Sequence, residues 1–176
     1  MVTIKRLDSS KIKDTMLDSF QRDQATTKVL VNESGSLVEK EDTFEDEWHL
    51  ARKREIVQHF RHVIDQGGAV IVANDDAGVV GFAVIEPGEF GQHSCYRELS
   101  YIHVSNEHRG KGIGKELFKV VTSVAIQLGA DKLYIGAHPS IETQGFYSRM
   151  GCVLAEEINE EIYMREPRDI QLEYIL

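Results

Sequence analysis

The residues best suited to chemistry form one glycine-rich segment in the second half of the chain. The segment His108–Gly114 (HRGKGIG) follows an apolar strand pattern and opens an amphipathic helix pattern. Glycines allow a tight turn and a close approach of the backbone to a ligand. The first turn of a helix leaves N–H groups unpaired and carries a partial positive charge. With the side chains of Arg109 and Lys111 added, the segment predicts a phosphate-binding loop.

The spacing of the glycines excludes two common phosphate loops. The segment lacks the Gly-Lys-Ser/Thr of a P-loop, and its alternating glycines do not match a dinucleotide fingerprint. Arg109, Gly112 and Gly114 instead form the pattern Arg-x-x-Gly-x-Gly after a strand. In this pattern the chain resembles the GNAT N-acetyltransferase superfamily, whose members bind the pyrophosphate of acyl-CoA there. A glycine loop that caps a helix without a ligand is the alternative.

The resemblance extends beyond the loop. The segment Gly145–Cys152 (GFYSRMGC) stands where the family has a short helix with a tyrosine, although Cys152 replaces a frequent phenylalanine. The similarity is specific from about Ala69 to Leu154. It implies an α/β fold, with a mixed, mostly antiparallel sheet, a splayed central pair of parallel strands and helices on both faces. We expect a single domain over 1–176, with its motif-bearing core at about 69–154.

The resemblance also implies a donor, acetyl-CoA, and no metal. In the family, the fourth strand pairs with the pantetheine arm through its backbone, and loop amides meet the pyrophosphate. The implied cofactor-binding residues are Ile102, His103, Val104, Arg109, Gly110, Lys111, Gly112, Ile113, Gly114 and Lys115.

The acceptor amine requires a base. A lysine-like amine, with a pKa of ~10.4, is neutral in only about one molecule in a thousand at pH 7. A carboxylate or a histidine can remove the proton directly or through water. We expect Glu98 to be this base, because histone acetyltransferases of the superfamily carry a glutamate at the matching position. Strand alternation also places Glu98 on the face of Ile102 and Val104. A salt-bridged strand end is the alternative, and His138 and His103 are other possible bases.

The departing thiolate needs a proton or a hydrogen bond. Tyr147 matches the family's tyrosine and is the expected general acid, with a packed aromatic ring as the alternative role. Cys95 and Cys152 have no partner pattern for nucleophilic catalysis, so direct transfer is expected. Phe44, Trp48 and the acids of Glu39–Glu47 are candidates for the acceptor wall, or else a core tryptophan and a solvated acidic loop.

The elements that position these residues follow from periodicity and turn signals. The predicted strands are Val2–Leu7, Ala69–Ala73, Val79–Ile85, Glu98–Val104, Lys132–Ala137, Cys152–Ala155 and Ile170–Ile175, with a hairpin of Val29–Val31 and Leu37–Glu39. The predicted helices are Lys11–Phe20, about Glu47–Gln66, Ile113–Leu128 and Glu142–Met150, with an excursion around Pro167 left undefined.

The charge and composition bound the possible partners. The formal net charge is -9, which argues against nucleic acid and against an anionic membrane surface. It permits a cationic amine. The chain has two cysteines and no apolar stretch of the ~20 residues that a membrane span needs, so we expect a cytoplasmic protein. The resemblance makes a homodimer possible.

The expected function is direct transfer of an acetyl group from acetyl-CoA to a primary amine of a small molecule or peptide. The acceptor itself has no legible signature in the sequence. Two other functions stay open at this point. One is an acyl-CoA sensor that binds without turnover, and the other is an interaction domain without a ligand.

Overall fold

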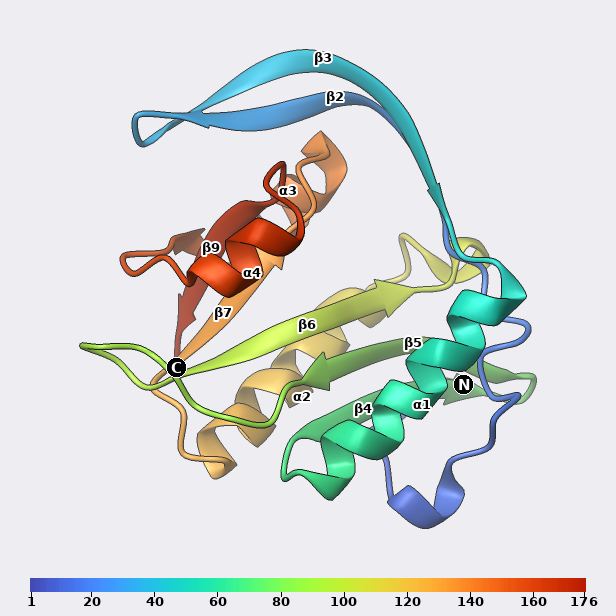
Figure 1. The fold of residues 1–176 in the computed structure, drawn as a ribbon. Coiled ribbons are helices and arrows are strands. Elements are labelled where there is room, and N and C mark those ends of the chain that lie inside the picture. Colours follow the sequence, from blue (N-terminus) through green and yellow to red (C-terminus); the bar gives the residue numbers. More distant parts are fainter.

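The computed structural model describes residues 1–176 and places a seven-stranded sheet at its centre (Figure 1). The strand order is β1-β4-β5-β6-β7-β9-β8, and every neighbouring pair is antiparallel except β6 and β7. The strands are β1 Thr3–Arg6, β4 Ala69–Asp75, β5 Gly78–Ile85, β6 Tyr96–Val104, β7 Lys132–Ala137, β8 Val153–Leu154 and β9 Ile170–Ile175. The predicted mixed α/β sheet is therefore confirmed.

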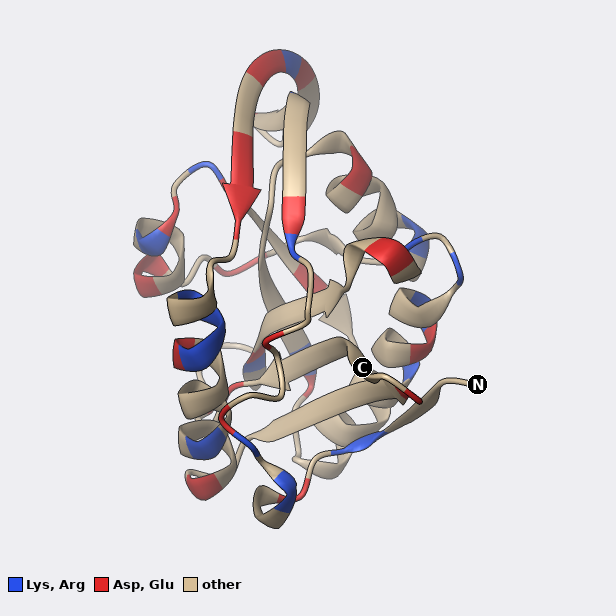
Figure 2. Cartoon of the chain, turned by 90° about the vertical axis from the view of Figure 1, so that its right-hand side faces the viewer, with Lys and Arg blue, Asp and Glu red and all other residues tan.

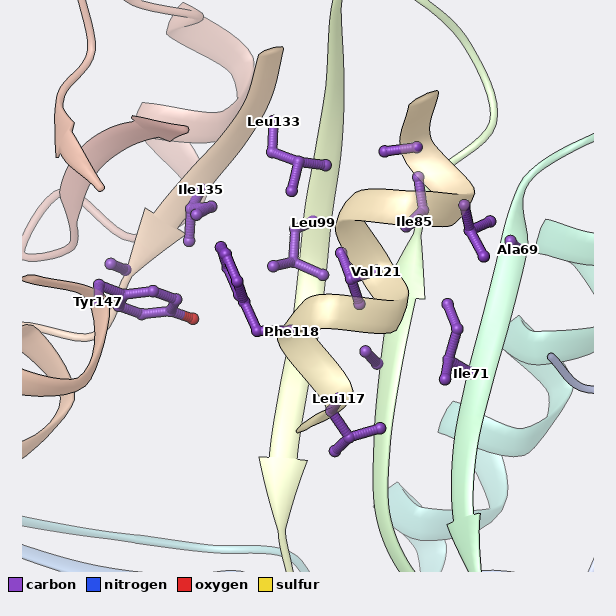
Figure 3. Packing of buried hydrophobic residues seen from close by; sticks show 14 of the residues in the cluster. Ala69, Ile71, Ile85, Leu99, Leu117, Phe118, Val121, Leu133, Ile135 and Tyr147 are labelled. Atoms are coloured by element: carbon purple, nitrogen blue, oxygen red, sulfur yellow. The ribbon is translucent and has the colours of Figure 1, made fainter. Parts of the chain in front are cut away.

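Helices cover both faces of this sheet, so its central strands are apolar on both sides. Helices α1 (Leu50–Asp65) and α4 (Glu160–Arg165) lie on one face. Helices α2 (Ile113–Gln127) and α3 (Ile141–Met150) lie on the other. Figure 3 shows Ala69 and Ile71 of β4 and Ile85 of β5 on the side of the sheet that α2 covers, in one cluster with Leu117 and Val121. No helix is both long and apolar enough to cross a membrane.

The parallel strands β6 and β7 part after three paired positions. Tyr96, Arg97 and Glu98 pair with Lys132, Leu133 and Tyr134, and beyond them the two strands diverge (Figure 1). Strand β6 stays paired with β5 as far as Val104. The second half of β6 therefore has one free edge, which faces the gap toward β7.

A bulge in β6 decides which side chains face each side. Val84 pairs with Tyr101 while Ile85 pairs with Leu99, so Ser100 is an extra residue. A bulge of this kind inverts the alternation of the strand. Leu99, Ile102 and Val104 consequently pack on the α2 side, whereas Tyr101 packs with the α1 cluster. The expectation that Glu98 shares a face with Ile102 and Val104 is wrong for this reason.

A long hairpin arches over the diverging strands. Strands β2 (Asp23–Glu33) and β3 (Ser36–Glu47) form a two-stranded sheet with the turn at Ser34 and Gly35. The hairpin prediction is confirmed, but Glu39–Glu47 belongs to β3 and is not a loop. Figure 2 shows acidic segments along β3, which includes the consecutive acids Glu41–Asp42 and Glu45–Glu47. Four of its six acids, Glu39, Glu41, Glu45 and Glu47, are exposed. Leu30 N–H donates to the carbonyl of Pro139 at 2.9 Å and holds the ribbon against the end of β7.

The N-terminal segment differs from its prediction. A helix was expected over Lys11–Phe20, but the structure has a single 3-10 turn at Ser9–Lys11 followed by irregular turns. Leu17 and Phe20 are buried in the cluster with α1. Tertiary burial of these side chains overrides the weak helical pattern. The excursion around Pro167 contains α4, which the pattern did not indicate.

Candidate active site

A cavity of about 900 Å³ lies where β6 and β7 diverge. Its walls come from the second half of β6, the glycine loop, α3, the base of the hairpin and the segment before β9. Segments far apart in the sequence therefore meet at one place, as in most ligand sites.

The glycine loop presents free backbone donors to this cavity. Gly110 and Gly112 have φ angles of 75° and 82°, in the left-handed region that favours glycine. Gly112 caps α2 without a side chain, and the first helical hydrogen bond runs from Glu116 N–H to the Gly112 carbonyl at 3.1 Å. The N–H groups of residues 113–115 thus have no acceptor in the helix. They are available to an anion.

Gly114 has a different role from Gly112. A Cβ atom at Gly114 would lie 3.0 Å from Cε1 of Phe146, tighter than most real contacts. The missing side chain lets the first turn of α2 pack against α3. One glycine therefore makes the turn, and the other allows the close helix packing that brings α3 to the cavity.

The side chain of Arg109 anchors the glycine loop through two hydrogen bonds to backbone carbonyls. Its Nε donates to the Val104 carbonyl at 3.1 Å, and its Nη1 donates to the Asp23 carbonyl at 3.3 Å. Burial lowers the pKa of the Arg109 guanidinium. The side chain of Arg109 is therefore anchored to the backbone on both sides of the loop. Lys115 lines the cavity, whereas Lys111 does not.

Nine of the ten predicted cofactor-binding residues line the cavity, all except Lys111. They are Ile102, His103, Val104, Arg109, Gly110, Gly112, Ile113, Gly114 and Lys115. The free edge of β6 and the free amides of α2 thus border one continuous space.

Tyr147 reaches the cavity from α3. Its ring packs in the core cluster near Phe118 and Ile135, and the side chain is 7% exposed (Figure 3). Burial raises the pKa of the phenol well above its usual range, and no hydrogen bond contributes to the shift. The phenol is therefore neutral and its O–H is an uncommitted donor.

Glu98 lies beside the cavity and does not line it. Both carboxylate oxygens are 2.8 Å from Nη2 of Arg165 on α4. Burial raises the pKa of Glu98, and the ion pair with Arg165 only partly opposes this shift. The structure thus holds the carboxylate in an ion pair at the end of the paired part of β6.

His138 and His103, the two histidines considered as bases, differ in their hydrogen bonds and packing. His138 Nδ1 accepts from the N–H of Ser140 at 3.1 Å, so Nε2 carries the proton that faces Asp46 Oδ2 at 2.8 Å. Both nitrogens are engaged. His103 packs edge-on against Trp48, with ring centroids 4.8 Å apart. Burial, Arg22 and Arg109 lower the pKa of His103 far below its usual value, so its ring is neutral.

Asp169 is a site residue that the sequence analysis missed. It precedes β9 and lines the cavity, and its Oδ2 lies 3.9 Å from where a Cβ of Gly136 would be. Burial, followed by repulsion from Glu166, raises the pKa of Asp169 to about 7. No ion pair or hydrogen bond holds its carboxylate. The glycine inside β7 marks close packing at this position, since a Cβ of Gly136 would lie 3.2 Å from Cγ2 of Ile162, but no local pattern marks Asp169 itself.

Arg22 is the second residue that the sequence analysis missed. It lies just before β2, is 6% exposed, and lines the cavity beside Trp48. Phe44, Asp46 and Trp48, which were candidates for the acceptor wall, also line it. No local pattern marks Arg22, because the hairpin brings it there.

Comparison with known proteins identifies the family. A family model described as Acetyltransferase (GNAT) family matches residues 35–152. No curated protein sequence gives a match.

Solved structures share the fold. Nourseothricin acetyltransferase is 19% identical with a TM-score of 0.67, covering 98% of this chain and 95% of that one. A Bacillus anthracis protein, assigned as a streptothricin acetyltransferase and solved with acetyl coenzyme A, is 15% identical with a TM-score of 0.71. That match covers 100% of this chain and 99% of the other. Ribosomal-protein-alanine N-acetyltransferase from Brucella melitensis is 18% identical with a TM-score of 0.54, covering 90% and 96%.

Proposed function

The chain belongs to the GNAT acetyltransferase family, whose reaction is acyl-CoA-dependent acetyl transfer, and we propose that it transfers the acetyl group of acetyl-CoA directly to a primary amine. The observation that carries this proposal is the single cavity that joins free loop amides, the free edge of β6, and the side chains of Tyr147 and Asp169. We further propose that the enzyme works in the cytoplasm, in line with its two free cysteines.

The residues around the cavity fit acetyl-CoA. The N–H groups at the start of α2 would bind the pyrophosphate, because unpaired amides and the helix dipole both favour an anion. The edge of β6 from Leu99 to Val104 lacks a strand partner toward β7, so its backbone would pair with the amides of the pantetheine arm. This arrangement would direct the thioester into the gap between β6 and β7.

The proposed reaction has one bond formed and one broken. The neutral amine nitrogen attacks the thioester carbonyl carbon and forms the new C–N bond. The C–S bond then breaks and the electron pair leaves with the thiolate of CoA. The amine proton passes to a base, and the thiolate receives a hydrogen bond or a proton. Cys152, the cysteine nearest Tyr147, has a pKa raised to about 12 by burial, so it does not supply a thiolate for an acyl-enzyme.

Asp169 is our preferred base. Its carboxylate lines the cavity, is free of partners, and has a pKa of about 7. A base with a pKa near the working pH is effective, because about half of it is ionised and it still binds a proton well. Glu98 remains the second proposal for the base, although its carboxylate is paired with Arg165. His138 would have to give up its bond from Ser140 to accept a proton.

Tyr147 would stabilise the leaving thiolate by hydrogen bonding. The pKa of its phenol is raised well above its usual value, whereas an ordinary thiol has a pKa of about 8.5. Complete proton transfer from the phenol to the thiolate would therefore be unfavourable. A hydrogen bond that strengthens as negative charge develops on sulfur needs no such transfer.

The test is release of CoA thiol from acetyl-CoA in the presence of an amine panel that contains polyamines, aminoglycosides, amino acids and peptides. We expect turnover with at least one amine, with the acetylated amine identified by mass spectrometry. Tight acetyl-CoA binding in calorimetry without turnover on any amine would instead support the acyl-CoA sensor.

A further inference from the structure

Arg22 is a buried charge that the proposed reaction does not use. It is 6% exposed and lines the cavity. Its Nε and Nη1 are buried and have no hydrogen-bond partner in the protein. Its guanidinium takes part in no ion pair, and Asp46, the acid that acts on it most strongly, is bonded to His138. A buried charge without a partner is unfavourable, so its presence in a cavity wall requires an explanation.

The surroundings hold Arg22 in place without neutralising it. The N–H of Trp48 donates to the Arg22 carbonyl at 3.1 Å and fixes the backbone. The guanidinium lies 5.7 Å from the centre of the Trp48 ring. Burial lowers the pKa of Arg22, attraction by Asp46 opposes this, and Arg109 adds repulsion. The side chain is thus held on an aromatic surface with its charge only partly balanced.

Arg22 lies beside Trp48 on the α1 side of β6, although its neighbours Gln21 and Asp23 are bonded to Asn106 and Arg109. Trp48 packs with Phe82 and Tyr101, in the cluster on the α1 side of the sheet. The free amides that would bind the pyrophosphate belong to α2, which packs on the opposite side. The part of the cavity that Arg22 and Trp48 share therefore lies across β6 from the first turns of α2.

We propose that Arg22 binds a carboxylate of the acceptor, so that the enzyme acetylates amines whose molecules also carry a carboxylate, namely amino acids. The inference rests on the proposed acetyl transfer and names its substrate class. A guanidinium is the side chain best suited to a carboxylate, because it is planar and offers several donors. Asp169, on another wall of the same cavity, would then serve the amine end of the acceptor.

The experiment uses ω-amino acids and their amides as matched acceptors. Glycine, β-alanine, 4-aminobutyrate, 5-aminovalerate and 6-aminohexanoate place amine and carboxylate at increasing separations, and each amide removes only the negative charge. We expect the acid to exceed its amide in kcat/KM for the chain length that spans from Arg22 to the thioester. The advantage should be about 30-fold or more, as for other buried charge pairs. Equal rates at every length would overturn the proposal.

Two variants show which arginine is responsible. Arg22→Gln should reduce the acid-to-amide ratio to about one while the KM for acetyl-CoA stays unchanged. Arg168→Gln removes the exposed cavity arginine that lies 4.3 Å over Phe44, and it should preserve the ratio. If the acid-to-amide ratio fell to about one in Arg168→Gln and not in Arg22→Gln, the assignment to Arg22 would be overturned. A raised KM for acetyl-CoA in Arg22→Gln, with the ratio intact, would reassign Arg22 to the donor.

A binding measurement separates this inference from the proposed function. Trp48 is the single tryptophan of the chain, so its fluorescence reports ligands beside Arg22. Titration with the N-acetylated ω-amino acids should shift the emission, whereas their amides should not. This readout needs no turnover. If the enzyme acetylated amines with no preference for a carboxylate, and neither probe shifted the emission, the role of Arg22 would be rejected and the proposed acetyl transfer would stand.

Stability gives a further check on a purely structural role for Arg22. If the guanidinium awaits a ligand, Arg22→Met should leave Tm unchanged or raise it, because an unbalanced buried charge is removed. A clear fall in Tm for Arg22→Met would show that the cation–π contact with Trp48 is the reason for the arginine, and would count against the proposal.

Discussion

Both carboxylate oxygens of Glu98 lie 2.8 Å from Nη2 of Arg165, at the last paired position before β6 and β7 separate. Glu98 is 12% exposed in this pair and Arg165 is 55% exposed. The ion pair joins the central sheet to α4. It also engages the carboxylate of Glu98, which the family resemblance implies as the base, whereas the carboxylate of Asp169 has no partner. Substitutions of Glu98 and Asp169 should therefore have different effects.

Asp169→Asn should remove the acidic limb of the pH–rate profile. The pKa of Asp169 is about 7, so kcat/KM for the amine should rise as the pH increases through this value and the carboxylate loses its proton. Loss of a general base commonly lowers the rate by about 100-fold or more. The measurement is kcat/KM between pH 5 and 9, with solvent-isotope controls. An unchanged limb in Asp169→Asn would exclude this residue as the base.

The same substitution should change stability in a pH-dependent way. The pKa of Asp169 is raised in the folded protein, so the stability linked to its protonated form is complete below the unfolded pKa. That stability is lost as the pH rises through about 7. Asparagine cannot ionise, so the variant should gain stability over wild type at pH 8 and not at pH 4. Urea unfolding at the two pH values measures the difference.

Glu98→Gln and Arg165→Gln should differ in their effect on stability. Burial raises the pKa of Glu98 despite Arg165, so folding favours its neutral form and a glutamine is tolerated. Arg165→Gln instead leaves a mostly buried carboxylate unpaired, which should cost about 1–3 kcal/mol of unfolding free energy. The loss should be larger at pH 8 than at pH 4. Glu98→Gln should also leave the pH–rate profile unchanged. Loss of the acidic limb in Glu98→Gln would instead identify Glu98 as the base.

Tyr147→Phe should lower kcat by about 100-fold with little change in the KM for acetyl-CoA, because the hydrogen bond acts on charge that develops at sulfur. The ring packing with Phe146 and Phe118 is retained in phenylalanine. Tm should therefore stay within a few degrees of wild type. A fully active Tyr147→Phe enzyme would reduce Tyr147 to a packed aromatic residue.

Gly112→Ala should weaken acetyl-CoA binding. Its φ of 82° would impose left-handed strain on alanine, of about 1–2 kcal/mol, and relief of the strain would move the amides that are proposed to bind the donor. Gly145→Ala is the matched control, because Gly145 lies inside α3 and its new Cβ would meet only the end of the Arg149 side chain, at 3.2 Å. Alanine there should stabilise the helix by up to about 1 kcal/mol and leave the Kd for acetyl-CoA unchanged. Calorimetry and thermal unfolding test both variants.

Local patterns predicted most of the sheet and the donor loop. Lys132–Ala137 and Ile170–Ile175 have the predicted bounds. The first contains a short apolar run, Leu133–Ile135, that is buried on both faces of the sheet, and the second alternates apolar and polar residues up to Tyr174. The prediction of a helix over Lys11–Phe20 is wrong, because the turns of this segment are stabilised by contacts with α1 that no local pattern contains. Glu39–Glu47 was assigned to a loop, because its acids hide the strand alternation of a ribbon exposed on one face.

The sequence by itself determined that a strand, a glycine loop and a helix follow one another and leave free amides at the start of α2, since turn geometry and free helix amides depend on consecutive residues. Only the tertiary structure decided which charged side chains line the cavity. The bulge at Ser100 reversed the facing of β6 beyond Glu98. Chain folding also brought Arg22 and Asp169 into one cavity. Burial shifts the pKa of both side chains. It arises from neighbours that are distant in the chain, so local sequence patterns cannot predict it.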